Sequence, residues 1–241
     1  PLAFELAFGA DGQLPAITIR EKNGTARVVG KVDRVDGWLH NGKLYLRVVD
    51  YKTGKKSFDL AELRYGLGLQ MLLYLFTLKE EGQMLFGGHE IVPAGVLYTP
   101  AREPMLRCAR DTADETIEKA RRKELRRSGM VLEDPAVLQA MEHSALESPC
   151  YLPIAVKRDG AVTGSLASAE QLGKLSKYVD HILHEITQEV FAGNIDADPY
   201  ARTPQQSACT YCEFASACHF ENGCGSDRME YIKATKNDEF W

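Results

Sequence analysis

The clearest hydrophobic pattern in the sequence is a pair of alternating apolar runs within residues 28–52, separated by Asn41-Gly42. Asn-Gly between such runs is typical of a type I′ β-hairpin, because both central positions need a positive φ. If these two residues form the whole loop, residues that pair across the strands have numbers that sum to 83. The pattern therefore predicts a hairpin in which Asp33 lies directly opposite Asp50.

Two facing carboxylates make the hairpin a candidate metal site. Residues opposite each other in antiparallel strands have Cβ atoms roughly 4.5–5.5 Å apart, where like charges are destabilising. A divalent cation such as Mg²⁺ supplies the missing counter-charge, because it prefers carboxylate and water oxygens. Strand alternation puts Lys52 on the face that carries Asp50, with the Tyr51 carbonyl between them. The combination predicts a site that binds and hydrolyses a phosphodiester.

The same residues have a simpler interpretation. Charged residues are mostly exposed, so this stretch is also compatible with a solvated surface hairpin that has no chemical role. Asp36 is the other carboxylate on the first strand. By alternation Asp36 faces away from Asp33, and we interpret it as structural.

A helix is predicted over residues 60–79, where apolar residues recur at helical spacing. Asp59 is a good N-cap, and Glu62 follows three residues later as in a capping box. Gly66 and Gly68 lower helix stability. Their presence suggests a helix that packs very close to a sheet or a ligand.

Gln70 and Tyr74 share one face of this helix, since they are four residues apart. Without further context, we interpret both as residues at the edge of the core. Residues 90–100 are predicted to form a strand after the helix. A crossover connection back to the same sheet is then expected, which indicates an α/β fold.

The remaining elements follow from shorter patterns. Glu5 lies in the first predicted strand, where a solvated side chain is the usual outcome. We predict strands over 4–8 and 14–19, a polar helix over 112–127, a short helix over 134–142, a strand pair over 154–162, and a long helix over 168–192 that Gly193-Asn194 ends.

The polar helix over 112–127 is strongly basic toward its C-terminal end. Such a charge run is usually a solvated helix face, and contact with phosphates is the alternative. The basic residues are Arg121, Arg122, Lys123, Arg126 and Arg127.

Composition limits the function classes. The chain has 241 residues and a formal net charge of −5, which argues against a generally basic nucleic-acid coat but allows a local basic groove. Its longest apolar run, 71–78, is too short to cross a bilayer, and no signal peptide is recognisable. We therefore expect a cytoplasmic protein. Because the chain starts at Pro1 without Met, we expect it to be part of a longer protein.

Four of the six cysteines lie close together near the C-terminus. Cys209, Cys212 and Cys218 have the spacing C-x2-C-x5-C, and clustered thiols in a chain without a secretory signal indicate a metal. Zn²⁺ and an iron–sulfur cluster are both compatible with this spacing. Cys224 or His219 could complete the site locally, or the fourth ligand lies outside the chain.

Several of these motifs together resemble a known family. The segments GKVDRVD, VVDYKTG and YGLGLQMLLYL resemble the RecB-like branch of the PD-(D/E)XK nucleases. The order of motifs, from FELAFG at Phe4 to CTYCEFASAC at Cys218, resembles the nuclease region of the AddB/RexB family of helicase–nucleases. The individual motifs are short, but their joint order over nearly the full chain is specific.

The resemblance implies roles for particular residues. By position, Asp33 and Asp50 match the metal-binding acids, and Lys52 matches the catalytic lysine. Gln70 and Tyr74 match a trailing Q-x3-Y motif near the DNA. The three cysteines of the C-x2-C-x5-C motif match three ligands of a [4Fe–4S] cluster whose fourth ligand lies far upstream. An upstream helix that brings a Glu or His to the metal is also absent, so the isolated chain is expected to be poor in metal or inactive.

The resemblance also implies a fold and a function. The expected fold is a restriction-endonuclease-like core, a central mixed sheet flanked by helices, over 1–110, followed by a helical and strand insertion with the C-terminal helix over 111–200 and a Cys-rich tail over 201–241. The expected function is Mg²⁺- or Mn²⁺-dependent DNA exonuclease activity in double-strand-break repair, beside an AddA-like helicase–nuclease partner and without a membrane. The alternatives are a catalytically silent DNA-binding or scaffold module and a zinc-binding interaction domain.

Overall fold

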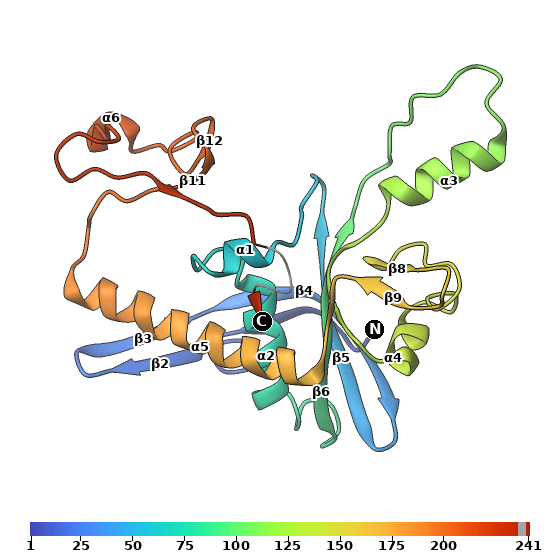
Figure 1. Cartoon of the computed structure of the whole chain (residues 1–241). Helices are drawn as coiled ribbons and strands as arrows, with labels where there is room; N and C mark the ends of the chain where they lie inside the picture. Colours follow the sequence, from blue (N-terminus) through green and yellow to red (C-terminus); the bar gives the residue numbers. More distant parts are fainter. Residues whose placement is uncertain (236–239) are drawn as a thin grey trace.

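A six-stranded mixed sheet forms the centre of the molecule (Figure 1). The computed structural model describes residues 1–235 and 240–241. Five of the six strands precede residue 133, and the predicted α/β class is confirmed. In spatial order the strands are β1 (Ala3–Phe8), β4 (Gly30–His40), β5 (Lys43–Lys52), β6 (Glu90–Pro100), β7 (Ser128–Leu132) and β10 (Leu166–Ala167).

The predicted hairpin is the antiparallel pair β4–β5. Asn41 and Gly42 form its turn with φ of 50° and 76°, and the pairs run in the predicted register from His40–Lys43 to Arg34–Val49. Strand β6 then pairs with β5 in parallel, as expected for a crossover connection. The register prediction is therefore confirmed up to the residue next to Asp33.

The continuous helix predicted over 60–79 is wrong. The structure has a short α1 (Leu60–Leu63) and a separate α2 (Gln70–Glu81). Gly66 and Gly68 between them have φ of 71° and 70°, a left-handed conformation that breaks the helical hydrogen-bond ladder. The N-cap is confirmed, because the Asp59 side chain accepts a hydrogen bond from the Ala61 N–H.

The sheet carries a core on each face. On one face, α2 and the long helix α5 (Ala169–Ala192) cover the larger core (Figure 1). On the other, α4 (Pro135–Met141) and the small hairpin of β8 (Ile154–Val156) and β9 (Val162–Gly164) cover a smaller one. The predictions of a short helix at α4, a strand pair at β8 and β9, and a long helix at α5 ended by the left-handed Gly193 are confirmed.

Two segments extend from this body. Strands β2 (Ile17–Glu21) and β3 (Gly24–Val28) form a hairpin beside α5, so the first 28 residues hold three strands and not the two predicted. Helix α3 (Asp114–Glu124) buries none of its residues and projects away from the sheet (Figure 1). It confirms the middle of the predicted helix over 112–127, whose ends are not helical.

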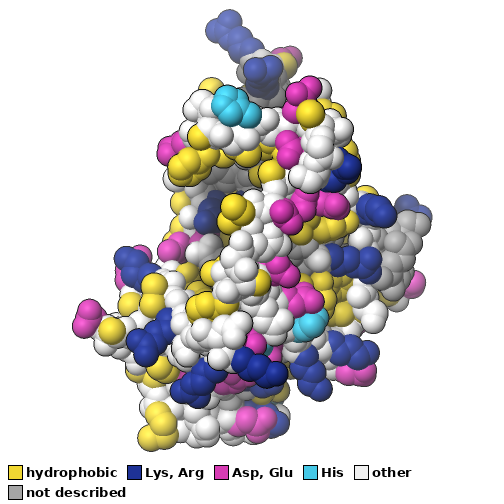
Figure 2. All heavy atoms as spheres, turned by 90° about the vertical axis from the view of Figure 1, so that its left-hand side faces the viewer, with side chains coloured by type: hydrophobic (Ala, Val, Ile, Leu, Met, Phe, Trp, Pro, Cys, Tyr) yellow, Lys and Arg dark blue, Asp and Glu magenta, His cyan; other side chains and the backbone are white. Residues whose placement is uncertain are grey.

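The Cys-rich tail folds beside α1. It contains β11 (Tyr200–Thr203), β12 (Gln206–Ser207), α6 (Ala215–Cys218) and β13 (Glu230–Tyr231), and its three strands form a separate small sheet. Figure 2 shows the face that carries this tail, with acidic and basic side chains interspersed. Within the tail predicted over 201–241, residues 236–239 lie outside the described residues.

One arginine ties the tail to the core. The Arg202 guanidinium lies 2.7 Å from the Asp59 carboxylate and 2.9 Å from that of Glu62. The Tyr65 hydroxyl also accepts a hydrogen bond from the Lys233 N–H at 3.2 Å. Glu62 therefore anchors the tail and forms no capping box, since no bond from its side chain to the Asp59 backbone is found at this helix start. Among the helices of the described residues, none has both the length and the apolar character of a membrane span.

Asp36 lies in a cationic network on the face of β4 and β5 opposite α2. The residue is 8% exposed, and its carboxylate accepts hydrogen bonds from Arg34 at 2.6 Å and Arg47 at 2.9 Å. Burial by itself raises the pKa of Asp36, but the hydrogen bonds and charges of the two arginines outweigh it and hold the pKa below its usual value. The prediction that Asp36 is structural agrees with this placement.

Asp36→Ala is expected to lower the free energy of unfolding by about 3 kcal/mol, because it leaves the largely buried Arg47 without its counter-charge. The matched control is Asp11→Ala at an exposed loop position, with a change below about 0.5 kcal/mol. Because the folded-state pKa of Asp36 is lowered, its stabilisation is present above about pH 3.9 and is lost as the pH falls further. Urea unfolding at several pH values tests both points; equal losses in the two variants would contradict them.

Two Gly→Ala substitutions should have opposite signs. Gly68→Ala forces a side chain into a left-handed φ and should destabilise the protein by about 1 kcal/mol, although the new Cβ has room. Gly173→Ala, inside α5 with nothing within 4 Å of the new Cβ, should stabilise it by about 1 kcal/mol. Chemical unfolding of both variants measures the difference. A Gly68→Ala protein as stable as the wild type would show that the break between α1 and α2 does not depend on this glycine.

Candidate active site

Asp33 lies at the point where the β4–β5 ladder ends. Its half-buried carboxylate accepts a hydrogen bond of 2.9 Å from the Tyr51 N–H. Val32 and Val35 both belong to the larger core, although regular alternation would place them on opposite faces. Strand β4 is therefore irregular at this point, and the Asp33 side chain takes a hydrogen bond from the backbone of β5. The hydrogen bond places the Asp33 carboxylate beside the peptide that joins Asp50 to Tyr51.

Asp50 is a buried acid with an incompletely satisfied carboxylate. The residue is 8% exposed, and its Oδ2 lies 2.8 Å from the Nζ of Lys52. The direction of this contact does not meet hydrogen-bond geometry, and the same oxygen has no hydrogen-bond partner among the described residues. The contact is therefore an ion pair, and one oxygen of a buried carboxylate remains able to accept a further ligand.

Lys52 lies between this acid and an aromatic ring. Its Nζ is 5.8 Å from the centre of the Tyr98 ring, and Tyr98 is the partner of Asp50 on β6. Burial and the negative charge of Asp50 raise the pKa of the Tyr98 phenol. Tyr98 is thus a neutral wall of the site. Sequence reasoning missed this residue, because the strand pattern over 90–100 does not give the register of a parallel pair.

The donor set fits a magnesium ion. In the part of the chain that the structure describes, no three Cys, His, Asp or Glu side chains form a metal-holding group. Mg²⁺ does not require one, because it usually keeps several waters and binds through one or two carboxylates together with substrate phosphates. Asp33 and Asp50 are the two carboxylates that could bind it, since the Oδ2 of Asp50 has an ion-pair partner but no hydrogen-bond partner among the described residues.

The other residues assigned by resemblance are less closely joined to this site. Gln70 donates a hydrogen bond of 3.2 Å to the Tyr74 hydroxyl, which lies against Gly30 at the start of β4. The described residues show no direct bond from this pair to Asp33 or Asp50. Their role near DNA therefore remains a prediction.

The cysteines of the tail are free. Cys209 is half-buried, whereas Cys212 and Cys218 are exposed. They lie around the short helix α6, but over residues 1–235 and 240–241 their thiols are not gathered into a metal-binding group, and Cys224 does not complete one. In this arrangement the three thiols do not form a finished site for a metal or a cluster.

Glu5, the acid of the first strand, pairs with Lys31 at the surface.

Comparison with known proteins identifies relatives over the whole chain. These relatives are all the same kind of protein, one subunit of an ATP-dependent helicase/deoxyribonuclease. The chain is 34% identical over 244 residues to that of Acetivibrio thermocellus. It is 34% identical over 245 residues to that of Clostridium botulinum (strain Loch Maree / Type A3), and 32% identical over 244 residues to that of Thermoanaerobacter sp. (strain X514). In each case all of this chain is covered, and it spans 21% of the relative's length.

A family model agrees with these relatives and with the geometry. The model of the PD-(D/E)XK nuclease superfamily matches residues 1–219, a range that includes the β4–β5 hairpin and all three acidic and basic residues at its end. The chain therefore belongs to the PD-(D/E)XK nuclease superfamily.

Proposed function

We propose that this chain is a Mg²⁺-dependent deoxyribonuclease domain that hydrolyses phosphodiester bonds in DNA. One observation carries the proposal: the Asp33 carboxylate bonds to the amide that follows Asp50, and Lys52 lies beside the same acid. These are the groups that metal-assisted hydrolysis requires, namely carboxylates for the cation and an ammonium for the phosphate.

Each residue then has a separate task. Asp33, Asp50 and the Tyr51 carbonyl would hold the cation, whose chemistry when bound would be to lower the pKa of a water and to stabilise charge on the scissile phosphate. In this structure Lys52 supplies the counter-charge of Asp50. Lys52 would orient the water or neutralise the phosphate if Asp50 also served as a ligand of the cation, because its ion pair with Asp50 would then be weaker.

The relatives suggest the biological setting. Their names describe one subunit of an ATP-dependent helicase/deoxyribonuclease, and this chain covers about a fifth of such a protein. We propose that it acts as an exonuclease in double-strand-break repair in the cytoplasm, together with an AddA-like partner. Since the names specify a deoxyribonuclease, DNA is the favoured substrate.

A catalytically silent DNA-binding or scaffold module is the second candidate. Lys52 already neutralises Asp50, and among the described residues no group of three Cys, His, Asp or Glu side chains is placed to hold a metal ion. A silent module would keep the fold and bind DNA without a cation. Calorimetry with Mg²⁺ distinguishes the two, because only the nuclease requires binding that depends on Asp50.

Asp50→Ala in the complete protein should abolish Mg²⁺-dependent cleavage of linear DNA, because it removes the buried metal-binding oxygen. Lys52→Ala should reduce the rate by about 100-fold with little effect on Mg²⁺ affinity. The exposed Asp11→Asn is the control and should cleave at the wild-type rate. Gel assays on linear and covalently closed circular DNA measure the rates, and the circular substrate should resist an exonuclease. Full activity of Asp50→Ala would defeat the assignment.

We also propose that Cys209, Cys212 and Cys218 are three ligands of a structural [4Fe–4S] cluster, with the fourth ligand outside this chain. The spacing C-x2-C-x5-C and the three free cysteines support a metal site, and the resemblance to the AddB/RexB family is what implies a [4Fe–4S] cluster in preference to zinc. The cluster would hold the tail, which Arg202 alone joins to α1 by ion pairs in the part of the chain described. Cleavage does not pass through it.

Anaerobically purified complete protein should contain about four iron atoms and a broad visible absorption, both lost in Cys212→Ser. The control Cys108→Ser changes an exposed cysteine outside the tail and should keep both signals. Elemental analysis and a visible spectrum make the measurement. Zinc without iron in the wild-type protein would replace the cluster by a zinc site.

A further inference from the structure

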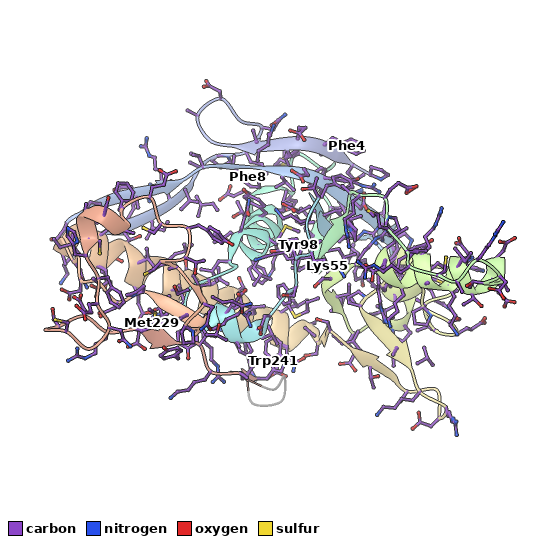
Figure 3. All side chains as sticks on the ribbon, turned by 90° about the horizontal axis from the view of Figure 1, so that it is seen from above. Phe4, Phe8, Lys55, Tyr98, Met229 and Trp241 are labelled. Atoms are coloured by element: carbon purple, nitrogen blue, oxygen red, sulfur yellow. The ribbon has the colours of Figure 1, made fainter. Side chains whose placement is uncertain are left out.

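A groove opens directly beside the candidate active site. Its volume is about 360 Å³, and its walls come from the segment after β5, the end of β6 and the base of α3. Lys52 and Tyr98 line both the groove and the active site. Figure 3 shows Tyr98 and Lys55 near one another at the centre of the molecule, next to the base of α3. One extended ligand can therefore occupy both the groove and the site at Asp50.

The groove is strongly cationic in an acidic chain. Its lining has six basic side chains and one acidic side chain, Glu124, whereas the chain as a whole carries a net charge of −5. Concave surfaces lined by one sign of charge concentrate ligands of the opposite sign. The basic residues are Lys52, Lys55, Lys56, Arg102, Lys123 and Arg126.

Glu124 is clasped by two of these cations. Its Oε2 lies 3.3 Å from the Nζ of Lys55 and 3.3 Å from a guanidinium nitrogen of Arg102. The hydrogen bond and charge of Lys55, with those of Arg102, hold the pKa of Glu124 below its usual value, so the carboxylate is charged at neutral pH. An anion thus already occupies the position between the two cations, where a second anion would compete for them.

The base of the groove is fixed by hydrogen bonds. The Phe58 N–H donates to the Ser128 hydroxyl at 2.8 Å, which ties the segment after β5 to the start of β7. The Arg126 guanidinium donates to the backbone carbonyls of Leu152 and Ile154, so this arginine has a structural role. These bonds hold the groove lining at Ser128 and Arg126 in place.

We infer that this groove binds the sugar–phosphate backbone of the DNA strand on one side of the scissile phosphodiester. Lys55 and Arg102 are the positioning residues, and Glu124 is the internal anion that the DNA phosphate displaces. This inference extends the proposed function, because the strand must pass Lys52 to reach the groove. A strand presents one phosphate for each ~3.4 Å of helix axis, which suits a row of several cations.

Binding measured without cleavage tests this inference. We would titrate labelled single-stranded and duplex oligonucleotides onto the complete protein in EDTA, over a range of salt concentrations. Lys55→Ala and Arg102→Ala should each weaken binding about 3- to 10-fold and reduce the slope of log K against log salt by roughly 0.7–0.9. Lys174→Ala is the matched control, since Lys174 is also ion-paired at the surface, with Glu170 on α5.

The opposite substitution gives a result that misfolding cannot imitate. Glu124→Gln removes the competing anion and should tighten DNA binding about 3- to 10-fold. Its control is Glu118→Gln on the same helix, where Glu118 pairs with Arg122 and does not line the groove; the change there should stay below about twofold. Unchanged affinity in Lys55→Ala and Glu124→Gln, or effects equal to those of the controls, would overturn the inference. The inference would also be overturned if polyglutamate bound as tightly as DNA and lost the same affinity in Lys55→Ala.

The outcome is separable from that of the proposed function. If Asp50→Ala still cleaves DNA, the metal site is wrong, whereas binding in EDTA still reports on the groove. If Asp50→Ala is inactive but Lys55→Ala binds DNA as the wild type does, the nuclease assignment stands and the strand takes another path.

Discussion

The tight turn at Asn41-Gly42 is the constraint on which the rest of the site depends. Its positive φ values set the register of β4 against β5, and that register brings Asp33 to the end of β5. Moving the pairing by one residue would turn Asp50 to the opposite face of the sheet. The irregularity of β4 at Asp33 adds a local adjustment, because the side chain accepts the Tyr51 N–H. A short-range backbone preference therefore positions the two candidate metal ligands.

Each face of this hairpin has one buried aspartate, and the two differ in how many hydrogen bonds their carboxylates accept. Asp36 accepts hydrogen bonds from two arginines and is fully committed to them. Asp50 is equally buried but has one flexible lysine beside it and an oxygen without a hydrogen bond. A buried carboxylate whose oxygens are all bonded to arginines contributes to a stable fold, whereas one with an oxygen that lacks a hydrogen bond can still bind a cation. The same contrast recurs at the groove, where Glu124 is held by cations that a phosphate can also bind.

The break between α1 and α2 has a consequence at the other end of the chain. Because the helix stops after Leu63, α1 can turn aside and present Asp59 and Glu62 to Arg202 of the tail. The Tyr65 hydroxyl in the same connection receives the Lys233 N–H. The tail is thus attached to the segment that follows the candidate catalytic lysine in the chain.

The sequence by itself determined the hairpin and its register, the strand over 90–100, and the caps at Asp59 and Gly193, because turn chemistry, alternation and capping are local. The cation ligands that it predicted remain a proposal. The sequence did not determine the break after Leu63, since Gly66 and Gly68 are compatible with a weak helix until tertiary contacts select the left-handed conformation. Tyr98 and the basic groove came from the tertiary structure alone. The parallel pairing of β5 with β6 and the return of α3 to Lys55 join residues far apart in the chain, and no short-range pattern fixes such contacts.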